Sequence, residues 1–263
     1  MLTHTFCHLP KVGPKKERAL WSKGIHTWDD FAAKMPKPEL IQDSQRYLEK
    51  RDPTYFADHL KPDQMWRLFP AFRNALAYVD IESTGIDRYG NIITTIALYD
   101  GKRVRTYIHG KNLDQFPQDI HRYKIIVTFN GRAFDVPFIE HYFGIRLNQA
   151  HIDLRPVLRS LGHKGPLKAI EKRFGIDRKE LKDVDGYFAV MLWHEYKRRN
   201  NKKALETLLA YNVADVVNLE TLLVEAYNMH VQETPFAHER ASFPRKKLTL
   251  PHKADAELLR RLS

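Results

Sequence analysis

Asp80 and Glu82 stand two residues apart in the segment AYVDIEST, which has the apolar and β-branched character of a strand. On a strand, residues two apart project from the same face, so these two carboxylates lie together and repel each other. A divalent cation such as Mg²⁺ or Mn²⁺ relieves that repulsion, because hard cations prefer oxygen ligands. Taken alone, the pair is more typical of a solvated strand end than of a metal site.

Two further acids stand in segments that follow along the chain. Asp135, in TFNGRAFDVPFI, is placed near the start of an expected helix directly after a buried strand. That place favours a first-turn acid, but it is also where α/β sheets collect their sites. Asp215, in LLAYNVADVVNLETLL, is expected on a long helix, four residues after Tyr211 and therefore on the same face. Each acid alone has an ordinary structural explanation, so the metal-site hypothesis requires that they meet.

The segments DIEST, FNGRAFD and YNVAD, in this order, resemble the three exonuclease motifs of the DEDD superfamily. The subtype is the one with a tyrosine four residues before the last aspartate (DEDDy). The closer resemblance is to the bacterial YprB-like, ribonuclease-H-like exonucleases, and the NG, FD and PF pairs are also similar to the proofreading domains of family B polymerases. The resemblance implies that two Mg²⁺ or Mn²⁺ ions are held by four metal ligands, Asp80, Glu82, Asp135 and Asp215. It implies that Tyr211 orients the attacking water.

The activity implied by this resemblance is 3′-to-5′ exonuclease cleavage of single-stranded nucleic acid, DNA favoured over RNA, which releases nucleoside 5′-monophosphates. Two metal ions activate the water and stabilise the attacking and leaving oxygens. Two alternatives stay open. The same core can serve a structure-specific endonuclease, since the chemistry needs no free end, or a non-catalytic nucleic-acid-binding module. The sequence indicates no particular protein partner.

Candidate substrate-binding residues lie inside or beside the motifs. Thr84 and Asn130 are expected to contact the terminal nucleotide, and Asn212 is a further candidate beside the last motif. Phe134 could stack on a base, although packing in the core is the favoured interpretation. Asp153, in HIDL, is expected to orient a ligand or to cap the following helix.

The elements that must position these residues are an α/β, ribonuclease-H-like mixed sheet with flanking helices. Three antiparallel strands are expected in LAYVDIE, NIITTIALYD and KRVRTYIH, joined at the turn signals Gly90-Asn91 and Asp100-Gly101. Parallel strands are expected in IIVTFN and HIDL. Helices are expected near 134–143, 155–161, 166–174, 185–198 and 202–231. We divide the chain into a helix-hairpin-helix-like module (1–37), a helical connector (38–74), the exonuclease domain (75–231) and a basic tail (232–263).

The first 37 residues contain LPKVGPKKERALWSKGI, which resembles a degenerate helix-hairpin-helix. The turn of such a module offers backbone N–H groups to a phosphate. The usual turn has two glycines one residue apart, but here Lys11 replaces the first and only Gly13 remains. Lys11, Lys15 and Lys16 are candidate contacts to a nucleic-acid backbone, and a structural cap on the core is the equal alternative.

Composition agrees with a polyanionic partner. The chain of 263 residues carries a formal net charge of +11, and 1–37 and 238–263 each hold seven Lys or Arg against three acids. Such an excess favours nucleic acid through phosphate contacts. One cysteine excludes an intrachain disulfide. With no membrane-length apolar run and no signal-peptide pattern, we expect a cytoplasmic protein, with a mobile tail after the last helix.

Overall fold

Five strands form one mixed sheet in the computed structural model, which describes residues 1–182, 184–243 and 250–262. The strands are β1 (Leu76–Ser83), β2 (Ile93–Tyr99), β3 (Val104–Ile108), β4 (Ile125–Thr128) and β5 (Ala150–Asp153). Their order across the sheet is β3-β2-β1-β4-β5. β1, β2 and β3 pair antiparallel, whereas β4 pairs parallel to β1 and β5 parallel to β4. The predicted arrangement of three antiparallel strands and then parallel strands is confirmed.

Further helices lie between the strands in the chain and after them. They are α6 (Phe116–Ile120), α7 (Asp135–Phe143), α8 (Leu154–Ser160), α9 (Leu167–Arg173), α10 (Gly186–Arg199), α11 (Lys202–Gln232) and α12 (Ala256–Leu262), with short 3₁₀ turns η4 (Leu113–Gln115) and η5 (Lys179–Leu181). η4 and α6 were not predicted from the sequence. α6 begins at Phe116 with Pro117 in its first turn, where the missing N–H costs nothing.

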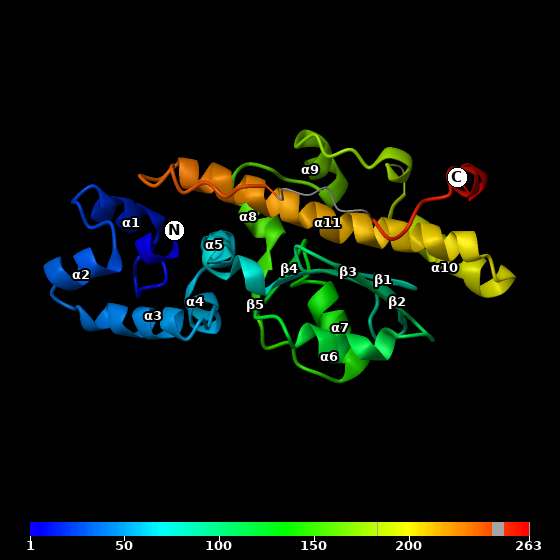
Figure 1. Cartoon of the computed structure of the whole chain (residues 1–263), viewed down its shortest axis with the longest axis horizontal. Coiled ribbons are helices and arrows are strands. Elements are labelled where there is room, and N and C mark those ends of the chain that lie inside the picture. The colour runs from blue at the N-terminus through cyan, green and yellow to red at the C-terminus, as the bar shows by residue number, and fades with distance from the viewer. Residues whose placement is uncertain (183, 244–249, 263) are drawn as a thin grey trace.

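Helices cover both faces of the sheet, with α11 on one side and α6 and α7 on the other (Figure 1). Alternate residues of β1 enter different cores. Leu76 and Tyr78 belong to the core shared with α8 and α11, and Ala77 and Val79 belong to the core shared with α6 and α7. Because side chains alternate along a strand, the next residues on the α11 face are Asp80 and Glu82.

The N-terminal third is helical, as predicted. It consists of η1 (Leu2–His4), α1 (Pro14–Trp21), α2 (Trp28–Lys34), α3 (Glu39–Glu49), α4 (Thr54–His59), η2 (Pro62–Leu68), α5 (Phe69–Phe72) and η3 (Arg73–Ala75). Thr27 is the N-cap of α2, because its hydroxyl accepts from the N–H of Asp30 and the Asp30 carboxylate accepts from the N–H of Thr27 in a capping box.

The turn before α1 keeps a glycine-like conformation at a lysine. Lys11 has a φ of 62°, in the left-handed region, and its side chain is exposed. Gly13 is the N-cap of α1 with an extended backbone. The turn therefore has the backbone conformation that glycine adopts easily at this position. For lysine the same conformation has a steric cost.

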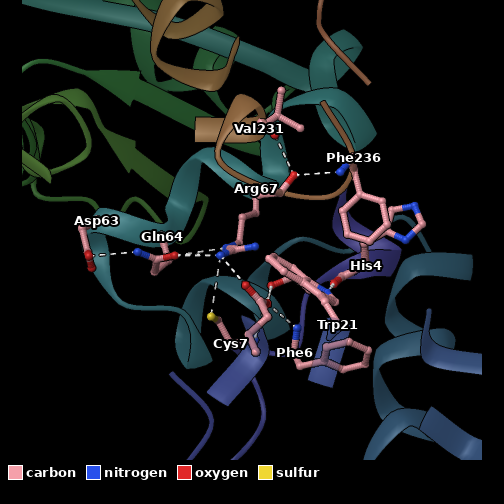
Figure 2. A network of polar contacts seen from close by, with 12 residues as sticks. His4, Phe6, Cys7, Trp21, Asp63, Gln64, Arg67, Val231 and Phe236 are labelled. Carbon is pink, nitrogen blue, oxygen red and sulfur yellow. Dashed lines mark hydrogen bonds and ion pairs between the residues drawn. The ribbon is translucent and has the colours of Figure 1, made fainter. Parts of the chain in front are cut away.

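A buried ion pair joins this module to the connector. Glu17 in α1 is 1% exposed and accepts hydrogen bonds from Thr5 Oγ1, the N–H groups of Phe6 and Cys7, and Arg67 Nη2 at 2.6 Å. Arg67 comes from η2, and Figure 2 shows its guanidinium facing Gln64 and Cys7. The packed residues of the module continue into the core beneath α11. The division at residues 37, 74 and 231 stays a prediction.

The chain after α11 contains ordered structure. Phe236 is buried against His4 and Trp21, and α12 buries Leu258 and Leu259 against α10 and α11. The expectation of a mobile tail is wrong for these residues, because two adjacent leucines on a short helix gain more by packing than the ordering costs. The basic excess of 238–263 was expected to favour nucleic acid, and three of its residues, Arg245, Lys246 and Lys247, lie outside the described residues.

α11 is the one helix in the described residues that is long and apolar enough to cross a membrane, by length and composition. Its most apolar window has a mean hydropathy of 1.3, but 83% of that window is buried inside the protein. It is the central core helix of this fold.

Arg67→Met is expected to lower the free energy of unfolding by about 3–5 kcal/mol, because it leaves the buried carboxylate of Glu17 without its counter-charge. Urea denaturation followed by circular dichroism measures the change. Lys15→Met, at an exposed position of α1, is the matched control and should stay within about 0.5 kcal/mol of the unchanged protein. Equal stability of the two variants would contradict the prediction.

Candidate active site

Three carboxylates meet where β1 passes beneath the middle of α11. Asp80, Glu82 and Asp215 each offer one oxygen, and these oxygens lie within 4.8 Å of one another. Glu82 and Asp215 are 8% and 4% exposed, and Asp80 is partly buried. The structure therefore brings the first and last motifs together on the same face of the sheet, although 132 residues separate Asp80 from Asn212 in the last one.

Asp135 approaches the same place from the start of α7. Its Oδ1 accepts a hydrogen bond of 3.1 Å from the N–H of Ile81, the residue between Asp80 and Glu82. Asp135 is not part of the closest group of three, yet it is 5% exposed and lines the same cavity. Its negative charge helps to raise the pKa of Asp80 and of Glu82.

Burial and mutual repulsion dominate the electrostatics of these acids. Burial, followed by the charges of Asp215 and Asp135, raises the pKa of Asp80 and of Glu82 well above the ordinary range. Burial raises the pKa of Asp135 from 3.8 to about 7, although the hydrogen bond from the N–H of Ile81 acts to lower it. Deprotonated, these groups need compensating positive charge, which divalent cations supply through oxygen ligands.

Tyr211 lies one helical turn before Asp215 on α11 and lines the same cavity. Burial, and then the charge of Asp215, raises the pKa of its phenol far above the ordinary value. The hydroxyl therefore keeps its proton at neutral pH. It can donate one hydrogen bond and accept another, as a group that orients water must.

Asn212 holds Asp80 in place. Its side-chain amide donates to Asp80 Oδ2 at 2.6 Å and to the carbonyl of Asp80, and its oxygen accepts from Thr95 Oγ1 at 3.1 Å. Asn212 is fully buried and does not line the cavity. It was predicted to contact substrate, but in the structure its amide is used inside the protein, because it projects from α11 toward the sheet.

Other predicted contact residues do line the cavity, which has a volume of about 690 Å³. Thr84 is held in the β1–β2 loop by Asn91 and the N–H of Ile92. Asn130 accepts from Arg155 at 2.6 Å. Phe134 is partly buried and packs edge-on against Phe138, which agrees with the packing interpretation.

Asp153 has the capping role that was expected of it. One of its oxygens accepts from the N–H groups of Asn130 and Arg155, and the other accepts from the N–H of Arg132. It thus caps α8 and fixes the loop between β4 and α7. Lys11, Lys15 and Lys16 are exposed on the N-terminal module and do not line the acidic cavity, and their contact with nucleic acid stays a prediction.

Two cationic residues that no sequence motif indicated, Arg178 and Lys168, lie beside the acids. Arg178 is 8% exposed and forms ion pairs with both Asp215 and Glu171, and its Nη2 donates to Glu171 Oε1 at 2.7 Å. Lys168 Nζ lies 5.1 Å from the centre of the Tyr211 ring. No motif marks these residues, because Arg178 stands 37 positions before Asp215. Only the folding of α9 and η5 against α11 brings them together.

The fold and the site define a ribonuclease-H-like nuclease core with an acidic centre whose carboxylates are candidate metal ligands. A family model of the RNase_H superfamily matches residues 77–227, so the chain belongs to that superfamily. The chain is 28% identical over 216 residues to the uncharacterized protein YprB of Bacillus subtilis (strain 168), a match that covers 72% of this chain. The chain spans about half the length of that relative, 51%. The predicted resemblance is confirmed at the level of the superfamily and of this relative.

Among solved structures, the chain is similar to the family B DNA polymerase from the hyperthermophilic archaeon Pyrobaculum calidifontis. The TM-score is 0.45 at 16% identity, over 62% of this chain and 26% of the polymerase chain.

Asp135→Asn is expected to gain stability relative to the unchanged protein as the pH rises from 3.8 to about 7, in the presence of a chelator. The raised pKa means that, across this window, the folded protein binds a proton that the unfolded chain has released. Deprotonation therefore costs folded-state stability, and asparagine removes that cost. Urea unfolding in EDTA at a series of pH values measures it.

The exposed Asp114→Asn is the control and should follow the unchanged protein at every pH. A constant difference between Asp135→Asn and the unchanged protein across the window would show that the carboxylate does not titrate as described. Excess Mn²⁺ should reverse the order of stability, because an ion that binds only the folded state stabilises it.

Proposed function

We propose that this chain is a metal-dependent 3′-to-5′ exonuclease that hydrolyses single-stranded nucleic acid, DNA favoured, to nucleoside 5′-monophosphates. The observation that carries the proposal is the meeting of four carboxylates from three separate segments with Tyr211 at one cavity. Membership of the RNase_H superfamily supports a nuclease of this type.

The acids suit a pair of divalent ions such as Mg²⁺ or Mn²⁺. Asp80, Glu82, Asp135 and Asp215 would hold them, and the ions would supply an activated water and stabilisation of the developing charge. The positive charge of Arg178 is already shared with Glu171, and Lys168 is a further cation near the acids, whose charge lowers the pKa of Glu82. The chain alone therefore leaves these carboxylates largely uncompensated. This deficit of positive charge agrees with the binding of more than one divalent cation.

The protein's own groups supply the positioning. The N–H of Ile81 orients Asp135, the amide of Asn212 orients Asp80, and Arg178 orients Asp215. Tyr211 retains its proton and can hold an attacking water by a hydrogen bond. Placing water and phosphodiester together in this way lowers the entropic part of the barrier.

The rim of the cavity suits an unpaired strand. Ile86 in the β1–β2 loop and Tyr187 at the start of α10 line it, and they are 90% and 73% exposed. Exposed apolar and aromatic side chains provide surfaces on which bases stack without regard to sequence. A cavity of about 690 Å³ lies in the range of pockets that hold small ligands.

Asp80→Asn is expected to abolish release of nucleotides, and Tyr211→Phe to lower kcat by about 100-fold with little change in KM, because the hydroxyl acts on water and not on the strand. The assay follows 5′-labelled single strands with Mg²⁺ and then Mn²⁺. Tyr89→Phe, an exposed tyrosine outside the cavity, is the matched control. Activity of Asp80→Asn equal to that of the unchanged protein would refute the proposal.

Strands with a blocked 3′ end and circular single strands test the direction and the need for an end. A 3′-to-5′ exonuclease should leave both intact while it degrades free linear DNA and, more slowly, RNA. Cleavage of circles at the rate of linear strands would identify an endonuclease on the same core. Binding of strands with no cleavage under either metal would identify a non-catalytic module.

A further inference from the structure

A second cavity lies beside the acidic one, between α9 and the segment that contains η5. Its volume is about 540 Å³. Its lining includes four cationic side chains, Lys168, Lys172, Arg178 and Lys182. The acidic cavity and this cavity meet within α9, because Leu167 lines the first and Lys168 lines the second.

The positive charge in this second cavity is poorly compensated. Glu171, one of its acids, already accepts from Arg178 and from Asn218 Nδ2 at 2.9 Å. Asp177, the other, accepts from the N–H of Lys179. In the part of the chain that the structure describes, Lys168, Lys172 and Lys182 form no ion pair. The lining therefore carries an excess of positive charge.

Two of the cations also face the acidic site. Lys168 Nζ and Arg178 Cζ lie 5.1 and 5.7 Å from the centre of the Tyr211 ring. Arg178 Nη1 is buried and has no hydrogen-bond partner among the described residues, although the guanidinium holds Asp215 and Glu171 with its other nitrogens. Tyr211, which lines the acidic cavity, thus lies close to two cations that line the basic cavity.

We propose that the basic cavity binds a phosphate of the substrate strand next to the one that is hydrolysed. This inference rests on the proposed function and names a second contact for the same substrate. A strand whose scissile phosphate lies at the carboxylates must pass along Tyr211, and its neighbouring phosphate then meets Lys168, Lys172, Lys182 and Arg178. Lysine and arginine are the usual ligands of phosphate oxygens.

The test measures binding apart from catalysis. The whole chain, in EDTA so that no strand is cut, is titrated with fluorescently labelled oligothymidylates at several salt concentrations, and anisotropy gives the affinity. Lys172→Gln/Lys182→Gln should flatten the slope of log affinity against log salt by about 0.7 for one lost phosphate contact on a single strand. Both lysines are exposed, so the variant should fold, and thermal unfolding checks this.

Lys61→Gln/Lys102→Gln is the matched control, since both residues are exposed and line neither cavity. It removes the same charge and should leave the slope unchanged. A variant and a control with equal slopes would overturn the inference, even if the unchanged protein cleaves strands as proposed. If the unchanged protein neither binds nor cleaves strands, both this inference and the proposed function are wrong.

Free nucleotide is the other source of the same phosphate chemistry. Thymidine monophosphate and inorganic phosphate are added as competitors to a bound strand. Under the proposal they compete weakly, because the cavity gains affinity from a phosphate that belongs to a longer strand. Strong competition that disappears in Lys172→Gln/Lys182→Gln would identify a mononucleotide site and overturn the inference.

Discussion

Repulsion among buried carboxylates is the constraint on which the rest of this structure depends. Asp80, Glu82 and Asp215 place oxygens within 4.8 Å of one another, and Asp135 adds its charge from the start of α7. Such a group is costly to bury unless the fold restrains it and a cation compensates it. The surrounding structure supplies the restraint, through Asn212 on Asp80, the N–H of Ile81 on Asp135 and Arg178 on Asp215. Because these acids repel one another, several neutral and positive groups of the protein surround them.

Local periodicity was enough to predict which residues share a face. The two-residue spacing of Asp80 and Glu82 and the four-residue spacing of Tyr211 and Asp215 each follow from one element's geometry. The mixed sheet followed from the order of strand and helix patterns, and it is confirmed. The prediction that these faces come together rested on the resemblance of three ordered motifs. No spacing within a single element implied it.

Contacts between distant segments were beyond such reasoning. Arg178 reaches Asp215 across 37 residues and Glu17 reaches Arg67 across 50, and neither arginine stands in a recognisable pattern. Asn212 was predicted to contact substrate because it lies in a motif, yet its position on α11 turns it toward Asp80 and Thr95. Burial of Leu258 and Leu259 depends on packing against α10 and α11, which no local pattern reveals.

Helix α11 runs from the acidic cluster to the N-terminal module as one continuous element (Figure 1). Asp215 lies near its middle, and Tyr227, farther along, contacts Trp66 and Phe69 of the connector. From Asp215 to Val231 the axis advances about 24 Å at about 1.5 Å per residue. The same helix thus carries a residue of the acidic cluster and residues that pack on the N-terminal third, so the placement of one depends on the packing of the other.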